Sequence, residues 1–459
     1  MRPRNQRARD LLLPTLGRMP RASVSELAAT LGVATPTLLK LLRECPAGSV
    51  VSGGRSVRTR YALRRPLRGS LADLPLYAID AAGNPALFAN LALIHPQGTQ
   101  LRLEQTGWPV PPEARDGWWD GLPYPLYDIR PQGYLGRSFA RAEHVRLGVS
   151  PDPEAWTDDD IVYALSQAGA DTPGNLILGD AAYARWQRSK VDTGEPVGGA
   201  AIGPHYVQLA ERTLAHGIAG SSAAGEFPKF AALRQEGLAT PHVLVKFSGA
   251  GGSAAEQRWS DLLVCEQLAL DCAARMPNIS SARTRIVQHA GRTFLESERF
   301  DRVGLFGRLP TSSLEVIAAA FVGSKLGDWP SLATLLQRDG LLAAESVQQI
   351  ELLWWFGQLI ANADMHQGNL SFRVSPVLTV APAYDMLPML YAPQRGGEVP
   401  AQDFDPSLPS LAQVEAWRTA ATQAIEFWQQ ASIDPRISEP FRSTCSANAQ
   451  RVRLLAERV

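Results

Sequence analysis

The sequence has few cysteines and no long apolar run. Its four cysteines form no C-x-x-C pair, which argues against a disulfide framework or a zinc site and fits a reducing compartment. No stretch of about 18 apolar residues is free of charges, and no apolar segment follows the basic amino terminus. We therefore expect a cytoplasmic protein without a membrane span or a secretory signal.

The sequence also lacks net charge, but its charges are unevenly distributed. The 45 Lys and Arg residues balance 45 Asp and Glu residues. Residues 1–68 hold 14 basic and 3 acidic side chains, so this head has a net charge of +11 and the remainder has −11. A basic head on an acidic body indicates contact with a polyanion.

The basic head has the pattern of a winged helix-turn-helix domain. The segment "SVSELAATLGV" has helical spacing after a cap at Ser23 or Ser25. A second helix, "ATPTLLKLLREC", begins with a cap at Thr35, and a hairpin that turns at Gly53-Gly54 follows it. The hairpin is the predicted wing.

Six side chains of the head are candidates for DNA contact. A second helix in the major groove and an arginine-rich wing on the phosphates is a common way to bind DNA. A helical protein-interaction module with a solvated basic face would give the same pattern. The candidates are Thr37, Lys40, Arg43, Arg55, Arg58 and Arg60.

The segment "ANADMHQGNLSF", residues 361–372, concentrates polar side chains between two apolar segments. Asp364 and Asn369 are five residues apart, as are the catalytic Asp and the metal-binding Asn of the protein-kinase loop H-R-D-x-x-x-x-N. The carboxylate can orient an attacking hydroxyl, and the amide oxygen can bind Mg²⁺. Asp385, in the next extended segment, supplies a second oxygen ligand of the kind Mg²⁺ prefers.

Further kinase-like features precede this segment in the expected order. A loop rich in Gly, Ser and Ala, "GIAGSSAAGEFPKF", is followed by a predicted strand that ends at Lys246. A helix then offers Asp261 or Glu266 as the partner of that lysine, and the strand "FLESERFDR" leads to a hinge. No G-x-x-x-x-G-K-[ST] motif occurs, so a P-loop NTPase is not supported. The order predicts a kinase-like phosphotransferase.

These segments resemble the HipA toxin kinases of bacterial toxin–antitoxin systems, with the added head most similar to the YjjJ-like branch. The resemblance covers residues 70–459 and includes the motif N-x-D-x-H-x-x-N at 362–369. It implies an α+β multidomain chain with a two-lobed, protein-kinase-like fold, a helical carboxyl-terminal lobe and a preceding winged helix-turn-helix domain. The implied domains are the head (1–68), a HipA amino-terminal subdomain (69–200), the kinase small lobe (201–305) and the helical large lobe (306–459).

The resemblance also assigns roles to individual residues, with ATP and Mg²⁺ as cofactors. Asp364 would be catalytic together with the metal ligands Asn369 and Asp385. Asn362 and His366 would hold the loop. Ser222 would be autophosphorylated, with Ser221 as the alternative. The nucleotide would be bound by Gly220, Ser222, Gly225, Lys246, Glu298 and Phe300.

The implied activity is that of a serine/threonine protein kinase that phosphorylates itself and a cellular protein, for which family targets suggest an aminoacyl-tRNA synthetase. In the family a separate antitoxin usually binds DNA, whereas this chain has its own basic head. Two other functions fit the sequence. One is a DNA-binding regulator whose inactive kinase fold senses a nucleotide, and the other is a small-molecule kinase of the aminoglycoside or choline type.

Overall fold

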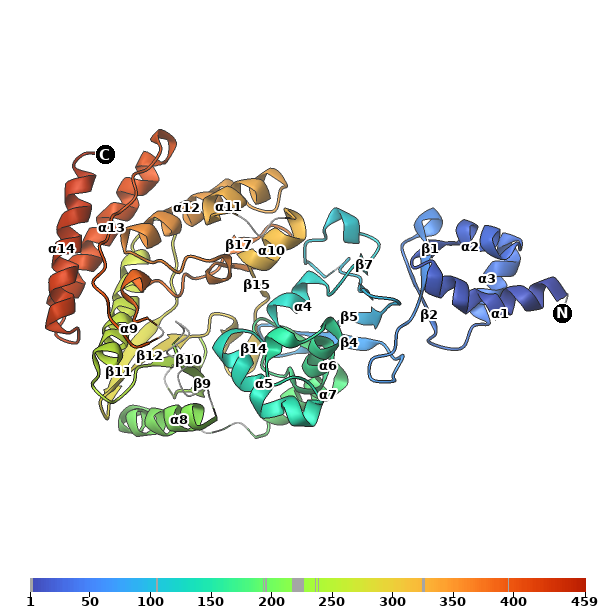
Figure 1. Cartoon of the computed structure of the whole chain (residues 1–459), viewed down its shortest axis with the longest axis horizontal. Coiled ribbons are helices and arrows are strands. Elements are labelled where there is room, and N and C mark those ends of the chain that lie inside the picture. Colours follow the sequence, from blue (N-terminus) through green and yellow to red (C-terminus); the bar gives the residue numbers. More distant parts are fainter. Residues whose placement is uncertain are drawn as a thin grey trace. The chain divides into compact units, whose positions relative to one another are not determined.

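The computed structural model describes two compact units (Figure 1). The first contains residues 1–79, 85–130 and 155–191, and the second contains 80–84, 131–154 and 192–459. Within the described part of the chain, no helix is both long and apolar enough to span a bilayer. The structure describes residues 3–104, 106–192, 194, 196–216, 227–235, 237, 239–323, 327–394 and 396–459.

The basic head consists of three helices and a small antiparallel sheet of order β1-β3-β2. The hydroxyl of Ser23 and the carboxylate of Glu26 form a capping box at the first turn of α2, as predicted for one of two candidate serines. The predicted cap at Thr35 is wrong by one residue, because Ala34 has the extended backbone and Thr35 is already helical. The elements are α1 (Pro3–Arg18), β1 (Ala22–Ser23), α2 (Val24–Leu31), α3 (Thr35–Arg43), β2 (Val50–Gly53) and β3 (Arg60–Leu63).

The remainder of the first unit is built on an antiparallel sheet of order β7-β6-β5-β4-β8. The capping box of Thr157 and Asp160 begins α6. The strands are β4 (Leu74–Ile79), β5 (Pro85–Leu93), β6 (Thr99–Gln100), β7 (Trp118–Trp119) and β8 (Leu176–Leu178). The helices are α4 (Tyr124–Asp128), α6 (Asp158–Ala168) and α7 (Asp180–Ser189).

The second unit contains an antiparallel sheet of order β11-β12-β10-β9 with a helix on each face (Figure 1). Tyr206 of α8 packs with Val243, Val245 and Phe294 on one face. Because side chains alternate along a strand, Lys246 points to the opposite face, where α9 lies. The elements are α5 (Gly133–Leu147), α8 (Ile202–His216), β9 (Lys229–Leu233), β10 (His242–Phe247), α9 (Ala254–Ala273), β11 (Thr284–His289) and β12 (Arg292–Glu298).

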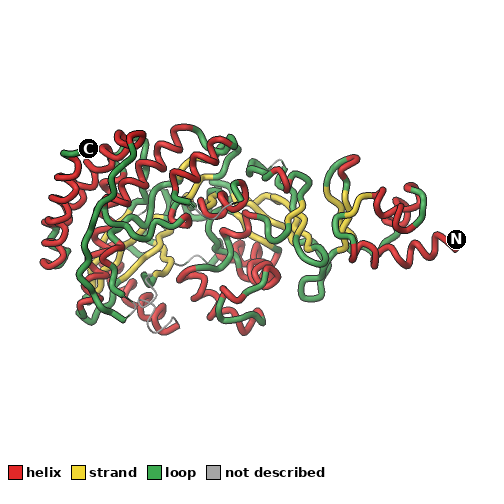
Figure 2. The backbone as a smooth tube through the Cα atoms, turned by 45° about the horizontal axis from the view of Figure 1, so that its top comes forward, coloured by secondary structure: helices red, strands yellow, loops and turns green. Residues whose placement is uncertain are grey.

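The carboxyl-terminal part of the second unit is mostly helical (Figure 2). Its helices bury large side chains such as Phe356, Trp417, Trp428 and Phe441. The helices are α10 (Leu314–Phe321), α11 (Trp329–Arg338), α12 (Ala344–Leu359), α13 (Val414–Ile433) and α14 (Glu439–Ala456). The strands are β13 (Arg302–Val303), β14 (Gly307–Arg308), β15 (Thr311–Ser313), β16 (Ser371–Arg373) and β17 (Thr379–Val380). The polar segment of residues 361–369 lies between α12 and β16, and Asp385 follows β17.

Candidate active site

A buried lysine on β10 is held by two carboxylates. The ammonium group of Lys246 donates to both side-chain oxygens of Glu266 on α9, each at 2.7 Å, and also to Oδ1 of Asp385. Lys246 is 8% exposed and Glu266 is 2% exposed. Of the two predicted partners for the lysine, the structure therefore selects Glu266. Asp261 lies in another part of α9.

The charged groups of this cluster shift one another's pKa values. Burial would raise the pKa of Asp385, but the nearby ammonium groups of Lys246 and Lys229 outweigh it and lower the pKa to about 2. Burial raises the pKa of Glu266 to about 7, although Lys246 opposes this rise. Burial alone would lower the pKa of Lys246. The carboxylates of Asp385 and Glu266 raise this pKa by more than burial lowers it, so the lysine stays charged.

Lys229 is a functional candidate that the sequence prediction missed. It is paired with Lys246 across β9 and β10, and its charge acts on both Asp385 and Glu266. The available signal was the lysine after Pro228 in "EFPKF", at the end of the Gly-rich segment.

The backbone of the polar segment is held by its own amide side chains. Asn362 accepts a hydrogen bond from the N–H of Asp364 at 3.1 Å and donates to the carbonyl of Asp385 at 3.2 Å. Asn369 donates through Nδ2 to the carbonyl of Asp364 at 2.8 Å. The loop that contains Asp364 is thus tied to Asp385. Asp364 itself is exposed, while Asn362 and Asn369 are buried.

His366 contributes to the shape of the same loop. Its Nδ1 accepts a hydrogen bond from the N–H of Gly368 at 3.1 Å, and its carbonyl accepts one from the indole of Trp329 at 3.1 Å. Both contacts hold the backbone of the loop in place, which agrees with the role that was predicted for His366. That role stays a prediction.

Asn369 and Asp385 are the residues of this site that could hold a metal ion. The Nδ2 atom of Asn369 is used within the loop, which leaves its Oδ1 as the atom suited to a cation. Within the described residues, no group of three or more His, Cys, Asp and Glu side chains is arranged to hold a metal. The donor set fits Mg²⁺, which takes one or two protein ligands and completes its shell with water and phosphate oxygens.

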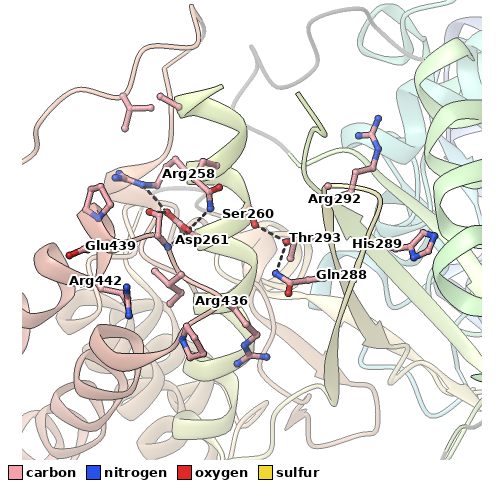
Figure 3. A pocket seen from close by; sticks show the side chains of 18 of the residues that line it. Arg258, Ser260, Asp261, Gln288, His289, Arg292, Thr293, Arg436, Glu439 and Arg442 are labelled. Atoms are coloured by element: carbon pink, nitrogen blue, oxygen red, sulfur yellow. Dashed lines mark hydrogen bonds and ion pairs between the residues drawn. The ribbon is translucent and has the colours of Figure 1, made fainter. Parts of the chain in front are cut away.

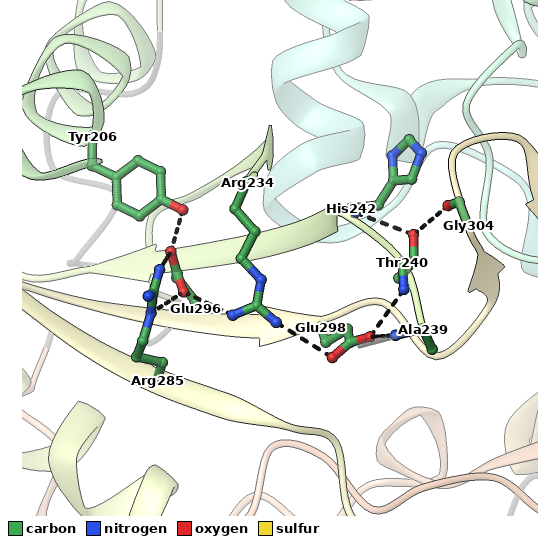
Figure 4. A network of polar contacts seen from close by, with 9 residues as sticks. All are labelled: Tyr206, Arg234, Ala239, Thr240, His242, Arg285, Glu296, Glu298 and Gly304. Carbon is green, nitrogen blue, oxygen red and sulfur yellow. Dashed lines mark hydrogen bonds and ion pairs between the residues drawn. The ribbon is translucent and has the colours of Figure 1, made fainter. Parts of the chain in front are cut away.

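Glu298 and Phe300 occupy the region predicted as the hinge. The carboxylate of Glu298 accepts hydrogen bonds from the N–H groups of Ala239 and Thr240 at 2.9 and 3.1 Å (Figure 4). Pairing with Val243 places the Glu298 side chain on the face of the sheet opposite Lys246. A nucleotide contact at this position would therefore use the main chain.

Phe300 connects the end of β12 to the segment that contains Asp385. Its ring lies 5.6 Å from the ring of Tyr384, measured between centroids, and Tyr384 precedes Asp385. The hydroxyl of Tyr384 donates to the carbonyl of Gly368 at 2.7 Å. These contacts bring the predicted hinge and the polar segment together. The predicted phosphate-loop residues Gly220, Ser221, Ser222 and Gly225 lie outside the described residues.

The predicted DNA-contact residues fall into two groups. Lys40 and Arg43 on α3 are exposed and Thr37 is half-buried. Lys40 also forms an ion pair, with Glu44 at 3.8 Å. The arginines of the predicted wing form ion pairs within the first unit as well. These are Arg55 with Glu104 at 2.8 Å, Arg58 with Asp116 at 3.7 Å and Arg60 with Glu26 at 2.7 Å.

The wing also packs tightly on the neighbouring sheet. Val51 and Ala62 share a buried apolar cluster with Trp118 of β7. A Cβ atom at Gly53 would lie 2.7 Å from both the carbonyl oxygen of Asp116 and the Trp118 ring. Part of the basic and apolar surface of the head is therefore in contact with the rest of the first unit.

Comparison with known sequences identifies the family. A model described as "YjjJ-like toxin, middle domain" matches residues 70–187, and one described as "HipA-like C-terminal domain" matches residues 221–451. The chain is 38% identical over 451 residues to Toxin YjjJ of Escherichia coli (strain K12), and the match covers 98% of each chain. The chain belongs to the HipA-like toxin family.

Two solved structures show similarity to this HipA-like chain. One is from the Shewanella oneidensis MR-1 complex of HipA, HipB and operator DNA, at 15% identity with a TM-score of 0.49, and the alignment covers 84% of this chain and 97% of that chain. The other is the Helicobacter pylori proinflammatory kinase CtkA, at 10% identity with a TM-score of 0.34, covering 51% and 92%. The family assignment rests on the sequence matches.

Proposed function

We propose that this HipA-like protein is an ATP- and Mg²⁺-dependent serine/threonine protein kinase whose head binds DNA. The observation that supports a kinase most directly is the buried cluster of Lys246, Glu266 and Asp385. In protein kinases a strand lysine pairs with a helix glutamate, and an aspartate that binds Mg²⁺ lies beside the same lysine. Here the three side chains come from β10, α9 and the segment after β17.

Each member of the cluster has a role in holding the nucleotide. Glu266 positions the ammonium group of Lys246, which would contact the phosphates of ATP. Asp385 stays ionised near neutral pH because its pKa lies at about 2, so it suits a divalent cation. Bound Mg²⁺ would neutralise phosphate charge, with Asn369 and Asp385 as its protein ligands.

Asp364 would act on the acceptor hydroxyl. Asn362 accepts a hydrogen bond from the N–H of Asp364, and Asn369 donates one to the carbonyl of Asp364. These bonds fix the main chain of Asp364, and its exposed side chain is accessible to a protein substrate. In that position it would orient the serine or threonine hydroxyl and accept its proton. An aminoacyl-tRNA synthetase is the substrate class that the family resemblance suggests.

The same activity would act on the protein's own loop. We assign Ser222, with Ser221 as the alternative, as the autophosphorylated residue. A phosphoserine carries nearly two negative charges, so beside the nucleotide phosphates it would repel ATP and switch the kinase off.

The head would supply the DNA-binding function that a separate antitoxin provides in related systems. The exposed Lys40 and Arg43 of α3 would contact DNA directly, together with Thr37. Arg55 and Arg58 are exposed as well and would add phosphate contacts in competition with Glu104 and Asp116. Contact with the bases would rest on α3.

The kinase proposal is tested by transfer of label from γ-labelled ATP in the presence of Mg²⁺. The wild-type chain should label itself, and Asp364→Asn should bind ATP equally well but transfer no label. ATP binding without transfer in the wild type would instead favour a nucleotide-sensing regulator. Transfer to an aminoglycoside or to choline, but not to any protein, would favour a small-molecule kinase.

A further inference from the structure

The second unit contains a large cavity beside the first half of α9. Its volume is about 1150 Å³, which is enough for a ligand the size of a nucleotide. The walls are the first half of α9, the turn between β11 and β12, and the connection from α13 to the start of α14 (Figure 3). None of the residues assigned above to the kinase site lines it.

Cationic side chains predominate in the walls of this cavity. They are Arg258, Arg292, Arg436 and Arg442, against the carboxylates of Asp261 and Glu439. Asp261 is 1% exposed and accepts hydrogen bonds from the hydroxyl and the N–H of Ser438, at 2.5 and 2.8 Å, which hold the start of α14. The arginines outnumber the carboxylates in the walls, so the cavity has an excess of positive charge.

Two arginines of the cavity lack a carboxylate partner. Among the described residues, no carboxylate forms an ion pair with Arg292 or Arg442 within 4.0 Å. Arg258 differs, because its Nε lies 3.9 Å from Oδ2 of Asp261. A ligand that supplies acceptor oxygens to the guanidinium groups of Arg292 and Arg442 would therefore be stabilised. Arg436, in contrast, is paired with Asp434 at 2.6 Å.

We propose that this cavity binds a small polyanion that carries phosphate groups. Figure 3 shows Arg258 and Arg442 on the wall formed by α9 and α14, and Arg292 on the wall formed by the hairpin. Cations on separate walls favour a ligand with more than one anionic group over a single carboxylate. Arginine suits phosphate because its planar donors match the geometry of the oxygens.

The ligand would brace the helix that carries Glu266. Arg258 and Glu266 both belong to α9, Arg442 belongs to α14, and Arg292 begins β12. A polyanion in contact with all three arginines would link these elements and fix the position of α9. Control of Lys246 through Glu266 rests on the proposed kinase function, whereas binding of the polyanion does not.

Calorimetric titration with inorganic pyrophosphate, without Mg²⁺, tests the site on the full chain. The double variant Arg292→Gln/Arg442→Gln should bind at least about tenfold more weakly, because two charged contacts to the ligand are lost. Arg453→Gln, outside this cavity on α14, should bind as the wild type does. Arg442→Lys keeps the charge and should retain most of the affinity. Equal binding by the wild type and the double variant would overturn the proposal.

The active-site lysine could also attract pyrophosphate, so a second variant separates the two sites. The double variant Lys246→Met/Glu266→Leu, which leaves neither side of that buried pair alone, should keep binding that depends on Arg292 and Arg442, and loss of all binding in this variant while it stays folded would contradict the cavity site. Parallel titrations with inorganic phosphate and with ADP distinguish a simple phosphate ligand from a nucleotide. Weak binding of phosphate and pyrophosphate with tight, arginine-dependent binding of ADP would identify a nucleotide as the ligand.

Hydrogen exchange gives a readout that is independent of kinase activity. Pyrophosphate should slow exchange in residues 254–261, 288–293 and 435–442 of the wild type, but not of the double variant. Protection confined to the region of Lys246 would contradict the proposal. If the cavity is protected but the chain binds no ATP, the cavity site stands and the proposed kinase function fails.

Discussion

Lys246 on β10 donates to both carboxylate oxygens of Glu266 on α9 at 2.7 Å, and both residues are buried. This pair ties the long helix α9 to the sheet at the point where Asp385 also meets the lysine. A buried ion pair is costly to break on one side only, because the remaining charge has no partner. The relationship therefore has measurable consequences for both stability and nucleotide binding.

Removal of Glu266 alone should destabilise the fold strongly. Glu266→Leu is expected to lower the free energy of unfolding by about 3 kcal/mol, the low end of the cost of breaking a buried pair, because Lys246 keeps its contact with Asp385. Lys246→Met should cost more, since it leaves both Glu266 and Asp385 without the ammonium group. The double variant Lys246→Met/Glu266→Leu should be more stable than Lys246→Met, because one buried carboxylate fewer is left without a partner. Urea unfolding of the wild type and the three variants measures the differences, and a double variant less stable than Lys246→Met would show that the two side chains do not compensate each other.

The same cluster predicts how stability changes with pH. The pKa of Glu266 is about 7 in the fold against 4.5 as its ordinary value, so the folded chain holds a proton that the unfolded chain releases. Because of Glu266, stability should fall as pH rises from about 4.5 to about 7. Asp385 acts in the opposite sense: its contribution is complete above about pH 4 and is lost as pH falls toward 2.

The charge of Asp385 is one cause of the raised pKa of Glu266, which gives the pH prediction an internal control. Asp385→Asn removes that negative charge, so the pKa of Glu266 should fall and the loss of stability between about pH 5 and pH 7 should shrink. Urea unfolding at the two pH values, with wild type and variant, measures this. An unchanged difference would mean that another group controls the pH dependence.

Asp385→Ala should abolish Mg²⁺-dependent binding of ATP. The substitution removes one of the two proposed metal ligands, and affinity measured without Mg²⁺ should change much less. Calorimetric titration with ATP, with Mg²⁺ and with EDTA, separates the two effects. Equal Mg²⁺-dependent affinity in wild type and variant would remove Asp385 from the metal site.

The close packing of the wing can be tested with one methyl group. Gly53→Ala would place a Cβ atom 2.7 Å from the Asp116 carbonyl and the Trp118 ring, so we expect a loss of about 1–3 kcal/mol in the stability of the first unit. The control is Gly396→Ala, where a Cβ atom would meet nothing within 4 Å. Thermal unfolding compares the two, and equal behaviour would show that the wing is not tightly packed.

Contact between the head and DNA should depend more on α3 than on the wing. Lys40→Gln/Arg43→Gln should weaken binding and reduce the slope of log affinity against log salt by about 1–2. Arg55→Gln/Arg58→Gln should change the slope less, because those arginines already pair with Glu104 and Asp116. Fluorescence anisotropy with a labelled duplex over a range of salt concentrations measures both slopes.

Local sequence patterns predicted the residues whose roles depend on spacing. The five-residue interval between Asp364 and Asn369 and the strand that ends at Lys246 were recognisable without a structure. The cap of α2 could be narrowed to Ser23 or Ser25, because a capping box involves residues three apart. These features are local, so the sequence contains all the information that they need.

Contacts between distant segments could not be predicted in the same way. The sequence offered Asp261 and Glu266 equally as partners of Lys246. Only the packing of α9 decides that Asp261 instead binds Ser438, 177 residues away. The orientation of Glu298 depends on the register of β12 against β10, and the pairing of the wing arginines depends on how the head packs in the first unit.

The central claim is that Asp364 and the cluster around Lys246 form a working kinase site. Intact-mass spectrometry after incubation with Mg²⁺ and ATP, on the wild type and on Asp364→Asn, tests it most directly. The account predicts the added mass of one phosphate on the wild type alone, with peptide mapping to Ser222 or Ser221. An unmodified wild type that still binds ATP, or equal phosphorylation of Asp364→Asn, would contradict it.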